Sequence, residues 1–129
     1  MFSNRFPEDI PDPSLVPGLT KEQVLGMPKS ILYVVKTDGS LVVAPKGGAP
    51  YGHIDLAGGE DVLAAGEGKI LWGTVKSLDN ASGHYLPIGP SAESAALDAF
   101  ENYGFKVSDG VYQEKVYMKS GSGLASATS

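Results

Sequence analysis

The segment LDNASGHYLP, residues 78–87, has turn-like composition yet gathers side chains that can do chemistry. Ser82 offers a hydroxyl, His84 an imidazole and Tyr85 a phenol, and a plain connection needs neither of the last two. Two more clusters stand elsewhere in the chain, His53 in YGHIDL and Glu114 in VYQEKVY. Imidazole, hydroxyl, phenol and carboxylate groups serve in acid–base chemistry and in positioning a ligand. These residues are therefore the candidates for a functional site.

Other kinds of site lack their sequence signatures. The chain has two His and no Cys, so a closed zinc site would need several carboxylates, and no tight ligand spacing is present. A Ser-His-Asp triad could combine Ser82 with either His and with Asp55 or Asp79, but no GxSxG elbow accompanies it. The GxxxxGK pattern of phosphate-binding loops is also absent. We therefore expect no metal in the site.

Each candidate also has a purely structural interpretation. An imidazole beside a Gly on a strand edge, as expected for His53, is more often structural than functional. Tyr85, at the end of a turn, would cover the edge of the core. Glu114 would face solvent in an alternating strand, but residues 113–115 are polar in succession, and strict alternation would place one of them inside. This break indicates that a polar group of the last strand faces the protein.

Strands are predicted on both sides of these clusters. Residues 30–45 read as a hairpin, because two β-branched runs flank Asp38 and Gly39, a pair that accepts the positive φ angles of a tight turn. Residues 61–78 read as two strands with a Gly-rich reversal at 66–68. Both segments favour antiparallel pairing.

Two helices and a final strand complete the predicted elements. Residues 20–27 form a short helix with Thr20 as its N-cap, and residues 91–105 form the one main helix. The main helix has an apolar stripe of Ala95, Leu97, Phe100 and Tyr103. Residues 110–118 alternate as a last strand. The fold class is therefore α+β, with a mostly antiparallel sheet and one main helix.

Length and composition indicate one globular domain. The chain has 129 residues, 42% of them hydrophobic, and a net charge of -5 that disfavours nonspecific binding to nucleic acid. Residues 1–20 are Pro-rich and read as a linker, residues 21–119 as the domain, and residues 120–129 as a flexible tail. The first segment lacks the apolar core of a signal peptide, and no run of 18 apolar residues indicates a membrane span. No homo-oligomer is implied.

In order and local context, His53, Ser82, Tyr85 and Glu114 resemble the signature of the ADP-ribosyltransferases related to diphtheria toxin and the poly(ADP-ribose) polymerases. That family uses a His on an early strand, a Tyr that opens a helix with a Ser three residues before it, and a Glu in a late strand flanked by aromatics. The resemblance covers roughly residues 50–118 through short motifs and implies a split β-sheet core.

Two positions in the sequence indicate which branch of this family the chain resembles. The only Arg of the chain is Arg5, so the branch with Arg in place of His is excluded. Gly52 precedes His53, whereas in the common pattern of the family a Gly follows the His. The resemblance is therefore to the His-Tyr-Glu type, with a departure next to its His.

The resemblance implies that NAD is the substrate and assigns a role to each residue. Glu114 would stabilise the oxocarbenium-like ribose as nicotinamide leaves, and would help to orient the acceptor. Tyr85 would stack on nicotinamide, and Ser82 would bond its carboxamide. His53 would hold the adenine-side ribose. Glu114 is thus the expected catalytic residue, and the other three are the expected NAD-binding residues.

A second likeness concerns residues 53–87, which look like C-terminal toxin domains of bacterial polymorphic secreted effectors of the Rhs kind. It implies export by a bacterial delivery system and action in the cytoplasm of a target cell. The acceptor of ADP-ribose would be a macromolecule of that cell, protein or nucleic acid. A cognate immunity protein would protect the producing cell.

Two other functions remain open from the sequence. A small metal-free ribonuclease toxin would use His53 and His84 as base and acid around a scissile phosphate. Against it, the acidic chain shows no run of Lys to bind RNA, and Glu114 has no task in that chemistry. A noncatalytic secretion or phage-associated structural module would use the same residues only for turns and packing.

Overall fold

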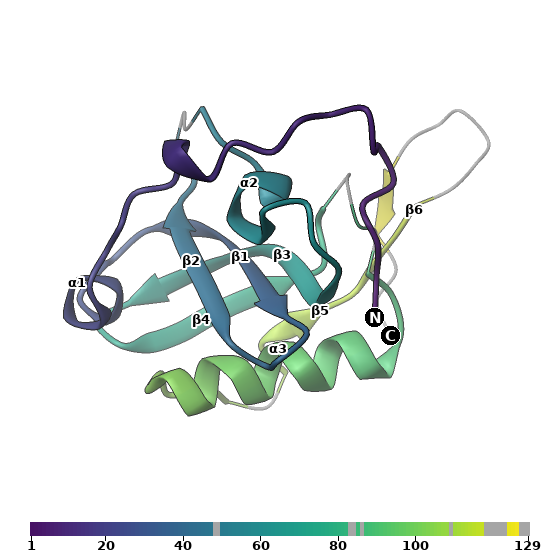
Figure 1. Cartoon of the computed structure of the whole chain (residues 1–129). Coiled ribbons are helices and arrows are strands. Elements are labelled where there is room, and N and C mark those ends of the chain that lie inside the picture. The colour runs from purple at the N-terminus through teal and green to yellow at the C-terminus, as the bar shows by residue number, and fades with distance from the viewer. Residues whose placement is uncertain (48–49, 83–84, 86, 109, 118–123, 127–129) are drawn as a thin grey trace.

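A five-stranded mixed sheet with the order β2-β1-β3-β4-β5 forms the centre of the molecule (Figure 1). The computed structural model describes residues 1–47, 50–82, 85, 87–108, 110–117 and 124–126. The strands of this sheet are β1 (Ser30–Lys36), β2 (Leu41–Pro45), β3 (Val62–Leu71), β4 (Thr74–Asp79) and β5 (Tyr112–Gln113). The first three neighbouring pairs are antiparallel, and β4 with β5 is parallel. The predicted α+β class with mostly antiparallel pairing is confirmed.

The hairpin of β1 and β2 forms as predicted. Gly39 has a φ of 87°, and the amide of Lys36 donates to the carbonyl of Ser40 at 2.8 Å to close the turn. The carboxylate of Asp38 accepts hydrogen bonds from the amide and the hydroxyl of Ser40. Apolar β-branched side chains then pair across the strands, as in Val34 opposite Val42.

Strand β3 is continuous, so the predicted reversal at residues 66–68 is wrong. A Cβ built on Gly66 would lie 1.9 Å from the carbonyl oxygen of Asp79, and one built on Gly68 would lie 2.7 Å from the carbonyl oxygen of Ser77. These glycines are thus required where another backbone crosses the strand closely, not for a turn. The reversal occurs at Trp72 and Gly73, whose φ angles are 46° and 80°.

Helices cover both faces of the sheet (Figure 1). Helices α1 (Lys21–Leu25) and α3 (Pro90–Tyr103) pack on one face, and α2 (His53–Ala57) packs on the other. The N-cap of α1 is Thr20, as predicted, and it forms a capping box with Gln23.

The buried side of α3 is only partly the predicted stripe. Its buried residues are Ala92, Ala96, Ala99 and Phe100. Three other stripe residues, Ala95, Leu97 and Tyr103, are partly buried against the same core. Small alanines at the centre of the contact let the helix approach the sheet, and Phe100 fills the space against Tyr33 with ring centroids 5.1 Å apart.

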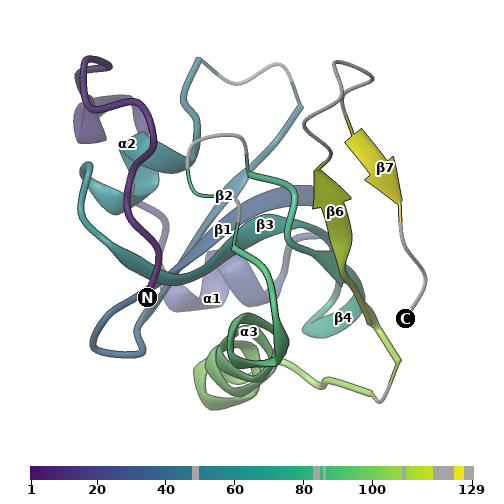
Figure 2. The same cartoon turned by 90° about the vertical axis from the view of Figure 1, so that its right-hand side faces the viewer.

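Both terminal segments contact the rest of the structure. The Pro-rich lead-in, which was expected to be extended, contains a short 3-10 helix, η1 (Pro13–Leu15), and lies along the domain. Phe2 pairs with Val62, and the amide of Asp12 donates to Asp55 of α2 at 2.6 Å. Near the other end, β6 (Lys115–Tyr117) pairs with β7 (Leu124–Ser126) in a second small sheet (Figure 2). The segment predicted as a flexible tail thus contains a strand, and its remaining residues lie outside the described ones.

Candidate functional site

The parallel pair β4 and β5 brings two chain segments to one edge of the sheet. Asp79 lies opposite Gln113, so residues 80–82 and Glu114 leave the sheet at the same end. The chain then runs from β4 through residues 80–89 into α3, whose first residue is Pro90. The carboxyl ends of neighbouring parallel strands and the start of the crossover helix commonly frame ligand sites in α/β units. We call residues 79–82, 89 and 112–114 the β4–β5 edge.

Main-chain and side-chain hydrogen bonds fix the loop that leaves this edge. The carboxylate of Asp79 accepts from the amides of Glu67 and Ala81, both at 2.9 Å. The carbonyl of Asp79 accepts from the hydroxyl of Tyr33 at 2.7 Å. Farther along, the buried side-chain amide of Asn80 donates to the carbonyl of Pro87 at 2.8 Å. The loop is therefore closed onto itself and onto β3.

Ser82 is a buried polar residue of this loop. Its side chain is 1% exposed, and its Oγ has no hydrogen-bond partner among the residues that the structure describes. Leaving a buried hydroxyl unsatisfied costs about 1–3 kcal/mol. A ligand group that paired with this hydroxyl would recover that cost.

His53 lies at the first position of α2, not on a strand as predicted. Its side chain is 7% exposed, and Nε2 lies 2.7 Å from the carbonyl oxygen of Gly66. Pairing of β3 with β4 begins only at Gly68, so the imidazole satisfies a carbonyl that β4 does not reach. The helix forms because the carboxylate of Asp55 accepts from the amide of Gly52, and Gly58 ends it with a φ of 62°.

Tyr85 is a core residue in this structure. It is 2% exposed, packs with apolar residues of α2, β1 and β3, and donates its hydroxyl to the carbonyl of Glu60 at 2.7 Å. Burial, followed by the nearby carboxylates of Asp61 and Glu60, raises the pKa of the phenol to about 12. Tyr85 precedes Pro90, the first residue of α3, by five residues, whereas the Tyr of the resembled family opens a helix.

The run of polar residues 113–115 predicts that one polar group of this segment faces the protein, and in the structure Glu114 contacts it. It lies between β5 and β6, where the predicted continuous strand is interrupted. Its Oε1 accepts a hydrogen bond from the amide of Gly89, the N-cap residue of α3. An amide at a helix N-terminus stabilises a negative charge. Burial first, and the charge of Glu114 second, raise the pKa of the neighbouring Tyr112 phenol well above its usual value.

The structure therefore divides the four predicted residues into two groups. Ser82 and Glu114 belong to the β4–β5 edge, whereas His53 and Tyr85 are buried and bonded to main-chain carbonyls on the α2 side of the sheet. His84, the other candidate imidazole, lies outside the described residues.

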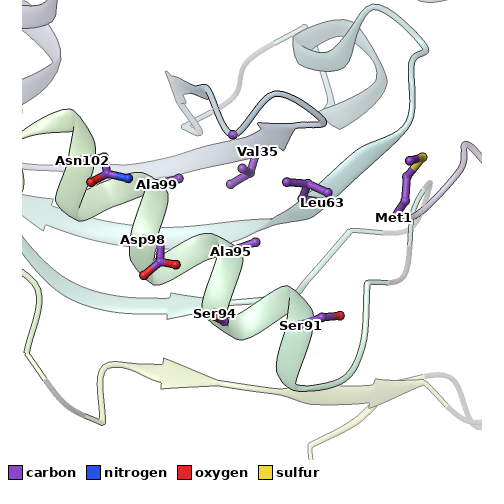
Figure 3. Close-up of a pocket in the computed structure, with 10 residues that line it drawn as sticks. Met1, Val35, Leu63, Ser91, Ser94, Ala95, Asp98, Ala99 and Asn102 are labelled. Atoms are coloured by element: carbon purple, nitrogen blue, oxygen red, sulfur yellow. The ribbon is translucent and has the colours of Figure 1, made fainter.

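A cleft that the sequence reasoning missed runs along α3 (Figure 3). Its volume is about 400 Å³, and Figure 3 shows Ser91, Ser94, Asp98 and Asn102 of the helix among its lining residues. Val35, Leu63 and Met1 line it as well. These polar residues recur at helical spacing in the sequence, so the pattern could have predicted a polar face of this helix beside its apolar stripe. None of the four predicted site residues lines this cleft.

Comparison of the chain with protein-family models, curated proteins and solved structures found no match. Among the residues that the structure describes, no group of three or more His, Cys, Asp or Glu side chains is arranged to hold a metal ion. Within the same residues, the helices are too short or too polar to cross a membrane.

Proposed function

We propose that the chain is an ADP-ribosyltransferase that transfers ADP-ribose from NAD to a macromolecule and releases nicotinamide, with Glu114 as its catalytic carboxylate. The observation that carries the proposal is the place of Glu114, which is held by the amide of Gly89 at the edge where the Ser82 loop leaves the sheet. A carboxylate that is already oriented stabilises a developing cation without reorganising during the reaction.

The proposed reaction needs one carboxylate and no metal. The bond between ribose C1′ and the nicotinamide nitrogen breaks, and its electron pair neutralises the cationic ring as nicotinamide leaves. Glu114 stabilises the positive charge that develops on the ribose. An acceptor nucleophile then bonds to C1′, and its proton passes to Glu114 or to water.

The position of Ser82 supports this proposal. Tyr85 and His53 could take part only if their buried side chains became exposed. The buried hydroxyl of Ser82 lacks a partner among the described residues and suits the nicotinamide carboxamide. Tyr85 is 2% exposed, so stacking on nicotinamide requires its ring to be uncovered first. The imidazole of His53, which is 7% exposed, would likewise have to be uncovered before it could bind a ribose. We propose that NAD binding is coupled to the exposure of these two side chains, and that the chain acts as an effector toxin in a target cell.

A noncatalytic interaction module is the second candidate. The polar atoms of His53 and Tyr85 are paired with the carbonyls of Gly66 and Glu60, as expected for residues that only stabilise a fold. The ribonuclease alternative receives less support, because the imidazole of His53 is 7% exposed and its Nε2 is already engaged with the carbonyl oxygen of Gly66 at 2.7 Å.

Labelled NAD and a cell lysate separate these candidates. We expect the purified chain to transfer label to lysate macromolecules and to release nicotinamide, and Glu114→Gln to lower both about a hundredfold or more. Gln keeps an oxygen that can accept from Gly89. Glu93→Gln is the matched control, because Glu93 is an exposed carboxylate in the first turn of α3 that also acts on Tyr112. Wild-type protein that neither transfers label nor consumes NAD would favour the noncatalytic module.

A further inference from the structure

The turn between β3 and β4 exposes an aromatic side chain that neither packing nor turn geometry explains. Trp72 is the only Trp of the chain and is 69% exposed. Trp72 and Gly73 both have positive φ angles, 46° and 80°, the conformation of a turn that favours Asn, Asp or Gly at its first central position. Leu71 beside it is 39% exposed. Two large apolar side chains are thus presented to solvent, one of them on a strained backbone.

Exposed lysines surround this turn. Lys69 and Lys76 lie on the two strands that lead into and out of it. The amide of Lys106 donates to the carbonyl of Gly73 at 2.8 Å, and the amide of Ile70 donates to the carbonyl of Lys29 at 3.1 Å. We call residues 71–73, together with these four lysines, the Trp72 tip.

The Trp72 tip lies at a basic end of an acidic chain. Figure 1 shows the β3–β4 turn near α1 and the last turn of α3, at the end of the molecule opposite the N-terminus. Segments 20–29, 69–76 and 101–106, which form this end, contain five Lys and two Glu, a formal charge of +3, whereas the whole chain carries -5. The apolar tip therefore coincides with a local excess of positive charge.

We propose that the Trp72 tip binds the surface of an anionic lipid membrane. The two apolar side chains are at the turn itself, and the lysines lie behind them along the strands and neighbouring segments, so Trp72 and Leu71 enter the interface while the ammonium groups reach lipid phosphates. Trp is favoured at membrane–water interfaces, where its ring is buried and its N–H remains hydrated. A single-stranded nucleic acid would instead need a groove and several stacking faces, and this tip offers one aromatic ring. The proposal does not depend on the enzymatic function.

The single Trp makes the test direct, because all Trp fluorescence of the full chain comes from Trp72. We expect its emission to shift to shorter wavelength, and the protein to sediment, with vesicles of phosphatidylcholine and phosphatidylglycerol but not with phosphatidylcholine alone. Raising the salt from about 0.1 M to about 1 M shortens the screening length from about 10 Å to about 3 Å and should release the protein. Equal binding to both vesicles, or binding to neither, overturns the proposal.

Two pairs of variants separate the tip from a general loss of structure. Trp72→Asn suits the turn geometry, so it should fold at least as well as wild type while its vesicle binding falls about tenfold or more. Ile10→Asn, at a position 89% exposed in the lead-in, should bind as wild type does. Lys76→Gln should weaken binding about fivefold, and Lys36→Gln, at the far end of β1, should not. Wild-type affinity in Trp72→Asn overturns the proposal, as does binding of an oligonucleotide in preference to anionic vesicles.

Discussion

Replacing Gly66 with Ala tests how closely the loop of the candidate site crosses strand β3. The added methyl group would lie 1.9 Å from the carbonyl oxygen and 2.7 Å from the carbonyl carbon of Asp79, and 3.0 Å from the Cα of Asn80. All three are main-chain atoms, so no side chain can rotate away to relieve the contact. The backbone at residues 79–80 must shift, or the variant must unfold.

The size of the effect follows from the contacts that such a shift breaks. Overpacking in a filled core costs about 1–3 kcal/mol. Moving Asp79 also strains the hydrogen bond from the hydroxyl of Tyr33, and moving Gly66 strains the contact with His53, each worth about 0.5–1.5 kcal/mol. We therefore expect Gly66→Ala to lower the free energy of unfolding by about 2–6 kcal/mol, out of a total of about 5–15 kcal/mol for a domain.

Urea denaturation followed by circular dichroism measures this change. Gly47→Ala is the control, because a Cβ at Gly47 meets nothing within 4 Å and Ala reduces the freedom of the unfolded chain. We expect the control to match the wild type or to exceed it by a few tenths of a kcal/mol. A Gly66→Ala protein within about 1 kcal/mol of the control would refute the close crossing of β3 by the loop.

Four further changes probe other parts of the structure. Replacing Trp72 with Asn should raise the free energy of unfolding by about 1 kcal/mol in thermal or urea melts, because it relieves a positive φ angle at a mostly exposed side chain. Replacing His53 with Leu should lower it by about 1–3 kcal/mol, since the buried carbonyl of Gly66 loses its partner, and an unchanged melt would contradict this role. Replacing Thr20 with Ala should cost about 1 kcal/mol through loss of the capping box, again by urea melt. The pKa of Tyr85 is raised to about 12 in the folded state, so its contribution to stability should be complete below about pH 10 and disappear as the pH rises through 12. Stability of wild type and Tyr85→Phe compared across this range should converge in alkali, and parallel curves would contradict the shift.

The parts of the fold that local chemistry determines were predictable from the sequence. The β1–β2 hairpin follows from the turn residues Asp38 and Gly39, and α1 from its capping residue Thr20. Three successive polar residues in an otherwise alternating strand predict that one of them faces the protein, and the structure shows that Glu114 does. In each case the cause lies within a few residues of its effect.

Features whose cause lies elsewhere in the chain were not predictable in this way. Gly66 resembles a turn glycine in sequence, and only the crossing backbone of Asp79 explains it. Helix α2 has five residues, too few for a helical period to appear, so the sequence around His53 does not distinguish a helix from a strand. Tyr85 has the same sequence context whether its ring covers a ligand or fills the core, and the structure places it in the core.

Release of nicotinamide from NAD by the purified chain is the most direct measure of the proposed activity. We predict steady release that depends on Glu114 and persists when Glu93 is changed to Gln. The same rate with Gln at position 114, or no release by the wild-type chain under conditions where it is folded, would contradict the assignment of this carboxylate to NAD chemistry.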